Sequence, residues 1–179
     1  MKIPFSPPDI TEEEIAEVAD TLRSGWITTG PKTKKFENEI AAFCHTSKAV
    51  CLNSATACAE MSLRVLGIGP GDEVITSAYT YTASASVAVH VGATLVLVDT
   101  QPDSYEKLES AITEKTKAII PVDLGGVICD YDKIYDIVEK KKSLFRPSTE
   151  IQKKMGRIAV VADGAHAFGA TKNGKHSGE

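Results

Sequence analysis

The sequence lacks several features that would assign it at once to a class of function. It has no excess of basic residues: 20 Lys and Arg stand against 24 Asp and Glu, and the formal net charge is −4. Nucleic-acid binding normally requires a clustered basic face, so this balance argues against a nucleic-acid partner. The one basic run, residues 140–142, closes a helical pattern, where cations interact well with the helix dipole. We therefore expect no nucleic acid among the partners.

Long hydrophobic runs are also missing. No apolar stretch approaches the roughly 20 residues that a membrane-spanning helix needs. The first residues, MKIPFSPPDI, hold a lysine but no segment that could form the core of a signal peptide. We expect no membrane span, no secretory leader and a cytoplasmic location.

Cysteine is scarce and shows no metal-binding pattern. The four cysteines are Cys44, Cys51, Cys58 and Cys129. They form no C-x-x-C pair, and no histidine is spaced from them as a zinc ligand would be. We interpret all four as reduced, which agrees with a cytoplasmic location, and we predict no metal site.

The glycine-rich phosphate-binding motifs are absent too. The chain has no G-x-x-x-x-G-K-[ST] loop. The segment GIGPGD, residues 67–72, does not match G-x-G-x-x-G and precedes a strand pattern, so we interpret it as a turn. These absences argue against an ordinary nucleotide-binding α/β domain, which stays open as an alternative.

What the sequence does contain begins with helical signals. Thr11 and Glu14 form a capping box, apolar residues follow at helical spacing, and Gly25 is typical of a helix C-cap. After the loop WITTGPKT, a second helical pattern carries apolar residues on one face. We predict an N-terminal helical segment over residues 1–46.

From residue 47 onward, short apolar strands alternate with helices. Strands are predicted at 49–53, 73–77, 94–99, 118–123 and 158–163, with helices at 54–67, 80–91, 107–115 and 131–142. This alternation indicates βαβ units, hence the α/β class with a mostly parallel sheet and flanking helices. The polar, Pro-containing segment 143–156 interrupts the pattern, and we interpret it as a surface insertion.

Ligands of open α/β sheets gather at the carboxyl ends of the strands. The polar residues predicted there are Ser54, Ala55 and Thr56, then Tyr79 and Tyr81, then Asp123, and last Asp163 and His166. Small and hydroxyl residues that open a helix suit a phosphate, although taken alone an N-cap is the simpler interpretation of Ser54 or Thr56. A tyrosine there either lies part-buried with its hydroxyl on a rim or stacks on an aromatic ligand.

Asp163 ends an apolar run, where an ionised carboxylate is rarely placed unless it is paired. One interpretation is that Asp163 is an N-cap for the residues that follow. The other is that it pairs with a cationic group of a ligand. His166 alone is more typical of a satisfied histidine than of a catalytic one. The residues by themselves leave both choices open.

Several long blocks in order extend the argument beyond single motifs. They are SGWITTGPKTKKFE, LNSATACAEMSLRVLGIGPGDEVIT, VGATLVLVD, AITEKTKAIIPVDLGG and VVADGAHAFGAT. With these blocks the chain resembles the DegT/DnrJ-type nucleotide-sugar aminotransferases, which bind pyridoxal 5′-phosphate and have the aspartate-aminotransferase fold (fold type I). The resemblance implies that residues 47–179 are an incomplete cofactor-binding large domain.

The resemblance also implies roles for individual residues. Six of them would bind the cofactor: Ser54, Ala55 and Thr56 at its phosphate, Tyr81 on the ring face, Asp163 at the pyridinium nitrogen and His166 near the ring hydroxyl. A carboxylate beside the ring nitrogen favours its protonated form, and the protonated ring draws electrons from a substrate carbanion. A pyridinium would then be the cation that Asp163 pairs with.

The sequence departs from the family pattern in three places. A PVH motif of many relatives is PVD here and ends in Asp123, and residues 143–156 lengthen a connection that relatives keep short. The family's Schiff-base lysine falls beyond Glu179, and Lys172 and Lys175 lie in a turn and are poor substitutes. We therefore predict no catalytic residue within the chain, no C-terminal small domain, and no activity of the chain alone.

The function that the resemblance implies is transfer of an amino group, with glutamate as donor, to a keto group of a nucleotide-linked sugar by a homodimer. One alternative keeps the fold: a sugar 3-dehydratase in which histidine replaces the lysine. Another is a non-catalytic cofactor-binding or regulatory remnant.

Overall fold

The computed structural model describes residues 7–100 and 104–179. These fall into two compact units that divide between Cys51 and Leu52. The first unit holds two helices and the second holds the sheet, and each is described by itself.

The first unit begins with α1 (Glu12–Ser24), and its N-terminus forms as predicted. The carboxylate of Glu14 accepts a hydrogen bond from the backbone N–H of Thr11 at 2.6 Å, and the N–H of Glu13 donates to the Thr11 hydroxyl at 3.2 Å. Gly25 ends the helix at φ 75°, a left-handed conformation that glycine adopts at little cost. The capping box and the glycine cap are both confirmed.

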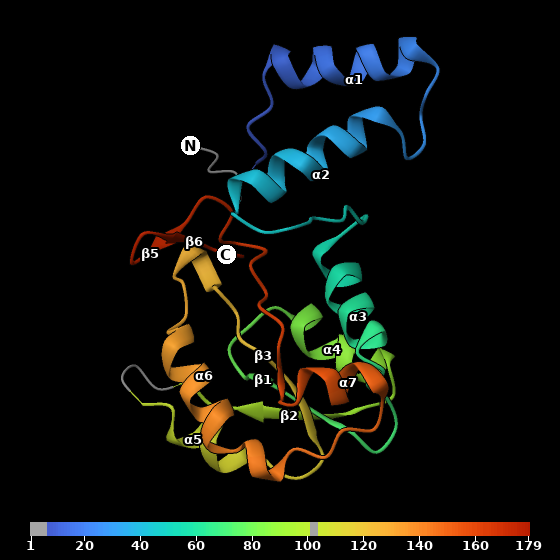
Figure 1. Cartoon of the computed structure of the whole chain (residues 1–179). Coiled ribbons are helices and arrows are strands. Elements are labelled where there is room, and N and C mark those ends of the chain that lie inside the picture. Colours follow the sequence, from blue (N-terminus) through green and yellow to red (C-terminus); the bar gives the residue numbers. More distant parts are fainter. Residues whose placement is uncertain (1–6, 101–103) are drawn as a thin grey trace. The chain divides into compact units, whose positions relative to one another are not determined.

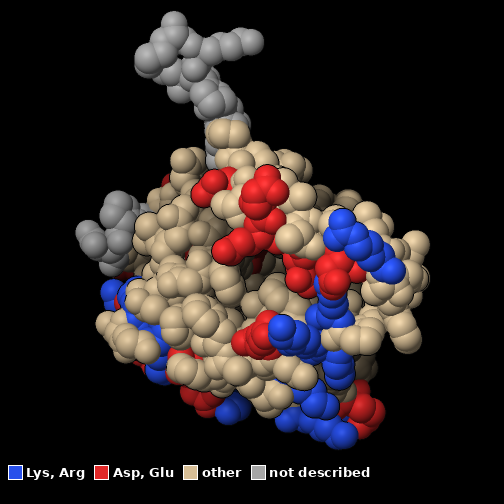
Figure 2. Space-filling view, turned by 90° about the horizontal axis from the view of Figure 1, so that it is seen from above, with Lys and Arg blue, Asp and Glu red and all other residues tan. Residues whose placement is uncertain are grey.

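The second helix of this unit is α2 (Pro31–Phe43). Lys32 ties the two helices together, because its ammonium lies 2.7 Å from carboxylate oxygens of both Glu17 and Asp20 on α1. Gly30, just before α2, lies against the Trp26 ring, and a Cβ there would approach the indole nitrogen to 2.2 Å. On the face drawn in Figure 2, basic side chains lie beside acidic ones and do not form a continuous basic field.

The second unit is a parallel sheet with helices on both faces (Figure 1). Its strands run in the order β2-β1-β3-β4: β2 (Thr94–Val98), β1 (Glu73–Ser77), β3 (Thr116–Ile120) and β4 (Ala159–Val160). Its main helices are α3 (Ala55–Val65), α4 (Thr82–His90), α5 (Glu106–Ala111), α6 (Tyr131–Lys140) and α7 (Glu150–Met155). Short 3₁₀ turns span Leu124–Gly126 and Lys142–Leu144, and a hairpin pairs β5 (Thr171–Lys172) with β6 (Lys175–His176). The α/β class and the mostly parallel sheet are confirmed.

Two hydrophobic clusters cover the two faces of the sheet. Successive residues of a strand point to opposite faces, and Val74 accordingly joins the cluster of α3 and α4 while Ile75 joins that of α5 and α6. The central strand β3 is buried along its whole length, as expected for a parallel strand covered on both faces. The sheet is therefore covered by apolar side chains on both faces.

The strand predicted at residues 49–53 does not form in the described chain. Val50 is 72% exposed and Leu52 is 43% exposed, so this apolar run does not enter either cluster. A strand needs a neighbour that accepts its backbone hydrogen bonds, and here β1 pairs with β2 and β3 instead. Apolar composition alone was not enough to predict a strand at this position.

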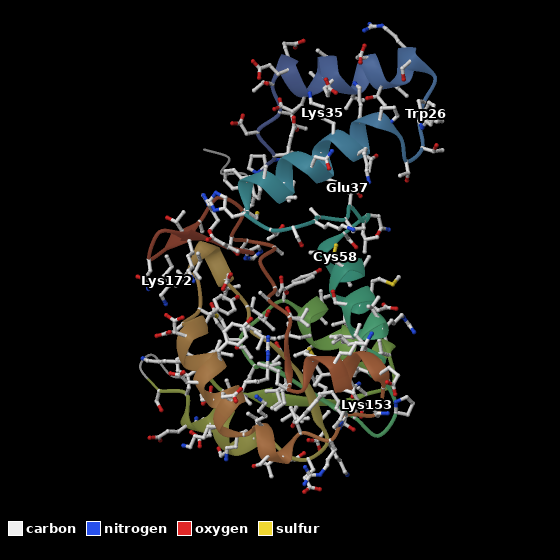
Figure 3. All side chains as sticks on the ribbon, viewed as in Figure 1. Trp26, Lys35, Glu37, Cys58, Lys153 and Lys172 are labelled. Atoms are coloured by element: carbon white, nitrogen blue, oxygen red, sulfur yellow. The ribbon has the colours of Figure 1, made fainter. Side chains whose placement is uncertain are left out.

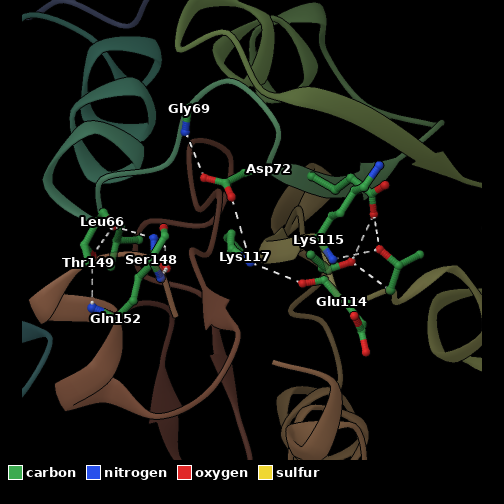
Figure 4. Close-up of polar contacts among 12 residues, drawn as sticks. Leu66, Gly69, Asp72, Glu114, Lys115, Lys117, Ser148, Thr149 and Gln152 are labelled. Carbon is green, nitrogen blue, oxygen red and sulfur yellow. Dashed lines mark hydrogen bonds and ion pairs between the residues drawn. The ribbon is translucent and has the colours of Figure 1, made fainter. Parts of the chain in front are cut away.

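The segment 143–156, which we predicted to be a surface insertion, is largely exposed but also packs against the rest of the second unit. It contains α7, and its Phe145 and Gln152 are buried. The Gln152 amide donates to the carbonyl of Leu66 at the end of α3, with the atoms 2.9 Å apart, and accepts from the N–H of Ser148 (Figure 4). The buried glutamine is hydrogen-bonded through both its amide oxygen and its amide nitrogen.

A buried cation lies in the same region. The ammonium of Lys117 on β3 donates to the carbonyl of Glu114 and lies 3.8 Å from a carboxylate oxygen of Asp72 (Figure 4). Asp72 also accepts from the N–H of Gly69. These bonds fix the turn that leads from α3 into β1.

Candidate active site

A cavity of about 220 Å³ opens at the carboxyl ends of the strands, on the side of α3 and α4. It is lined by Ala55, Thr56, Ala59, Thr80, Tyr81, Ala83, Ser84, Val122, Leu124, Asp163, Ala165 and His166. Five of the six residues predicted to bind a cofactor are in this lining, and Ser54 is not. All lining residues belong to the second unit.

The first wall of the cavity is the N-terminus of α3. Ser54 is the N-cap, and its hydroxyl accepts a hydrogen bond from the N–H of Ala57 at 3.1 Å. The first N–H groups of a helix have no acceptor inside it, and the helix dipole adds partial positive charge there. Ala55 and Thr56, which follow the cap, therefore place a site suited to an anion against the cavity.

The opposite wall carries Asp163. Its backbone continues the sheet beyond β4: its N–H donates to the carbonyl of Pro121 at 2.8 Å, and its carbonyl accepts from the N–H of Asp123 at 3.0 Å. Its carboxylate accepts from the Ser84 hydroxyl at 2.6 Å and from the N–H of Ala165 at 3.2 Å. No cation is among these partners, so the negative charge of Asp163 is available to a ligand.

Ser84 is a site residue that sequence reasoning missed. It lies on α4, is 1% exposed, and its hydroxyl also pairs with that of Thr80 at 2.8 Å. A signal was present, because Ser84 shares the buried side of α4 with Val87 and Ala88 at helical spacing. A hydroxyl among those apolar residues needs a partner, and Asp163 is that partner.

Tyr81 and His166 complete the lining. Tyr81 is the N-cap of α4. It is 74% exposed, so its ring face is open to a ligand. His166 lies near the turn after β3, where the N–H of Gly125 points at its Nδ1 at 3.4 Å. Nδ1 is therefore the acceptor of this hydrogen bond.

Asp123 lies next to this cavity but does not line it. It is completely buried, and its carboxylate accepts from the N–H of Cys129 and the hydroxyls of Tyr131 and Ser177 at 2.9 to 3.0 Å. Burial first, and then the Asp123 charge, raise the pKa of Cys129 to about 11 and also raise the pKa of Tyr131. Asp123 therefore has a structural role: it joins the loop before α6, α6 itself and the C-terminal segment, and it does not line the cavity.

The lysines near the C-terminal hairpin are outside the cavity lining. Lys172 lies on β5 (Figure 3), and its ammonium donates to the carbonyl of Ile128 at 3.3 Å. Across the described ranges, no three His, Cys, Asp or Glu side chains are grouped as a metal site would require. None of the helices in those ranges combines the length and the apolar character needed to cross a bilayer.

Comparison with known proteins assigns this arrangement to a family. Residues 8–179 match the model of the DegT/DnrJ/EryC1/StrS aminotransferase family, and the chain belongs to that family. It is 41% identical to the spore coat polysaccharide biosynthesis protein SpsC of Bacillus subtilis (strain 168), over 96% of this chain and 46% of SpsC. It is also 41% identical to the UDP-4-amino-4-deoxy-L-arabinose–oxoglutarate aminotransferase of Shewanella sediminis, over 99% of this chain and 43% of that protein. The chain thus spans less than half the length of these curated relatives.

A solved relative has the same fold. The PMP-form of the putative sugar aminotransferase Spr1654 from Streptococcus pneumoniae aligns with a TM-score of 0.97 at 60% identity, over all of this chain and 46% of that one. The PLP-form of the same protein aligns with a TM-score of 0.96. The predicted family and the fold type I architecture are confirmed.

Proposed function

We propose that this chain supplies the cofactor-holding part of a pyridoxal-phosphate-dependent sugar aminotransferase. The observation that carries the proposal is one cavity that is lined by both the first residues of α3 and Asp163. The first suits a phosphate and the second suits a protonated ring nitrogen. Pyridoxal 5′-phosphate carries both groups, and the relative Spr1654 has been solved in PLP and PMP forms.

The lining residues fit this cofactor. Ala55 and Thr56 would hold the phosphate, Tyr81 would lie on the ring face, Asp163 would pair with the ring nitrogen, and His166 would approach the ring hydroxyl. The cofactor supplies an electron sink for a substrate carbanion. The residues themselves bind and orient it, and Asp163 holds the proton on the ring nitrogen.

We further propose that the whole protein acts on a keto group of a nucleotide-linked sugar, with glutamate as the amino donor. The names of the two curated relatives support this class, because one acts on a UDP-linked amino sugar with oxoglutarate and the other belongs to polysaccharide biosynthesis. In such a transfer the sugar carbonyl becomes an amine and glutamate becomes 2-oxoglutarate. The test is mass spectrometry of both products after incubation of the full-length protein with cofactor, glutamate and a UDP-linked keto sugar. Formation of neither product, in a protein that binds the cofactor, would contradict the reaction.

Cofactor binding can be tested without turnover. Equilibrium dialysis of pyridoxal 5′-phosphate against the purified chain should show binding that Asp163→Ala weakens and Asp136→Ala, an exposed change on α6, leaves unchanged. Equal affinity in all three proteins would remove Asp163 from the site. A wild-type chain that binds no cofactor would remove the proposed site altogether.

We also propose that the protein is a homodimer. Ile15, Val18 and Leu22 recur on one side of α1 and are 51%, 60% and 64% exposed. A row of exposed apolar side chains is typical of a surface that a partner covers. Light scattering after gel filtration tests this, and a species of 19.1 kDa alone would contradict it.

A further inference from the structure

We propose that Thr80 and Ser84 form a relay of two hydroxyl groups that positions Asp163, so that Ser84 is a positioning residue for the ring nitrogen of the cofactor. The inference rests on the proposed cofactor site and deepens it. It starts from three atoms in a row: the Thr80 hydroxyl lies 2.8 Å from the Ser84 hydroxyl, which lies 2.6 Å from Oδ2 of Asp163.

The direction of the relay follows from the number of hydrogens. An ionised carboxylate can only accept, so Ser84 gives its single hydroxyl hydrogen to Asp163. Ser84 can then only accept from Thr80, and Thr80 is the donor of the outer bond. Each hydroxyl thus has one orientation, and the separation of 2.6 Å lies in the range of charge-assisted O–H···O⁻ bonds.

The relay completes a set of restraints on Asp163. Its backbone is fixed by Pro121 and Asp123 on the neighbouring strand segment, and Oδ1 accepts from Ala165 on its own loop. Among the described residues, the Ser84 bond is the one side-chain restraint on the carboxylate that comes from a helix. Without it, the carboxylate could turn about its side-chain torsions while the backbone stayed in place.

Burial makes this bond effective. Ser84 is 1% exposed, so water does not compete for its hydroxyl. Thr80 lies nearer the rim of the cavity and is half-buried. Loss of the Ser84 hydroxyl should therefore have the larger effect, and loss of the Thr80 hydroxyl a smaller effect in the same direction.

The test compares two ligands that differ at one ring atom. Pyridoxal 5′-phosphate has the ring nitrogen, and its 1-deaza analogue has C–H there, so only the first can use a positioned Asp163. Equilibrium dialysis should show that Ser84→Ala raises the Kd of pyridoxal 5′-phosphate about tenfold and Thr80→Val about threefold. The Kd of the deaza analogue should change by less than about twofold in either variant, since it has no nitrogen to bond.

Two controls make the result specific. Ser86→Ala removes another hydroxyl from α4, one that donates to the carbonyl of Ala83 and is outside the cavity lining, and it should change neither Kd. Thr80→Ser keeps the outer hydroxyl and should bind as the wild type does. Thermal unfolding checks that each variant is folded, and Thr80→Val carries the test if Ser84→Ala does not fold.

Each outcome is decisive. Selective weakening of pyridoxal 5′-phosphate supports the relay. Equal weakening of both ligands shows that the hydroxyls only support the shape of the cavity and overturns it. Weakening by Asp163→Ala but by neither hydroxyl variant overturns the relay and leaves the proposed cofactor intact. A wild type that binds neither ligand overturns the cofactor and the relay together.

Discussion

Two aspartates that are neighbours in the sheet have opposite surroundings. Asp123 and Asp163 follow adjacent strands and share a backbone hydrogen bond, in which the N–H of Asp123 donates to the carbonyl of Asp163 at 3.0 Å. Asp123 is completely buried and its carboxylate accepts three hydrogen bonds from the protein. Asp163 is half-buried, accepts two, and faces the cavity.

The difference shows how the same residue type is enclosed by internal donors in one place and left open toward a cavity in the other. Around Asp123 the chain itself provides the donors, from the loop before α6, from α6, and from the C-terminal segment. The carboxylate of Asp163 accepts fewer hydrogen bonds from the protein, and its remaining acceptor positions are left for the cavity that it lines. Position at a strand end is therefore not enough to identify a site residue, and the count of internal donors decides.

The largest effect is expected at the structural aspartate. Asp123→Ala leaves the Tyr131 and Ser177 hydroxyls and the Cys129 N–H without their acceptor and should lower the free energy of unfolding by about 3 kcal/mol. Urea unfolding measures this. The exposed Asp136→Ala should stay within about 0.5 kcal/mol of the wild type, and a similarly mild Asp123→Ala would contradict the structural role.

At Asp163, substitution should affect cofactor binding more than it affects the free energy of unfolding. Asp163→Ala should raise the Kd of pyridoxal 5′-phosphate about thirtyfold, equivalent to about 2 kcal/mol and more than for Ser84→Ala, because the proposed charged partner of the ring nitrogen is lost. Its free energy of unfolding should fall by about 1 kcal/mol, less than for Asp123→Ala, because the hydroxyl of Ser84 keeps Thr80 as a partner. A larger loss of stability in Asp163→Ala than in Asp123→Ala would contradict the contrast drawn between the two aspartates.

Single donors to Asp123 should have intermediate effects. Ser177→Ala and Tyr131→Phe each remove one hydrogen bond to a buried carboxylate, and each should cost about 1.5 kcal/mol in urea unfolding. In the background of Asp123→Ala both changes should cost less, because the shared acceptor is already gone. Additive effects in the double variants would show that the three side chains do not act together.

The smallest effect is a dependence on pH at the same cluster. The pKa of Cys129 is raised from its ordinary value near 9 to about 11, by burial first and then by Asp123. A raised pKa means that the folded state favours the neutral thiol, so its contribution is complete below about pH 9 and is lost as the pH rises toward 11. The stability difference between wild type and Cys129→Ala should shrink by about 1 kcal/mol over that interval, a value discounted because the thiol is part-exposed. Cys58→Ala controls for loss of a thiol, and a constant difference for Cys129→Ala would contradict the assignment.

Much of the fold could be predicted from local patterns. The strand at 73–77 and the α1 capping box are set by near-neighbour residues, and both form as predicted. The run 49–53 has an equally apolar pattern but forms no strand, because strand formation depends on a pairing partner that no local pattern reveals. In segment 143–156 the polar Gln152 is buried and bonds the distant carbonyl of Leu66, which no local pattern reveals.

The site was predictable to the extent that it follows strand ends and a helix start. Thr56, Tyr81 and Asp163 line the cavity because the carboxyl ends of parallel strands meet at one edge. Ser84 was missed because its role depends on the bond to Asp163, which only folding brings near. The burial of Asp123 was likewise invisible, because its donors come from three separate segments.

The bond from Gln152 to the carbonyl of Leu66 has a consequence for synthesis on the ribosome. It joins residues 86 positions apart and closes the end of α3, the helix whose beginning carries Ala55 and Thr56. At roughly 5 to 20 residues per second, the glutamine is made on the order of 4 to 17 s after the leucine. During that delay the carbonyl of Leu66 at the end of the nascent α3 lacks its glutamine partner, and a chaperone that recognises exposed backbone and apolar surface has this interval in which to bind it.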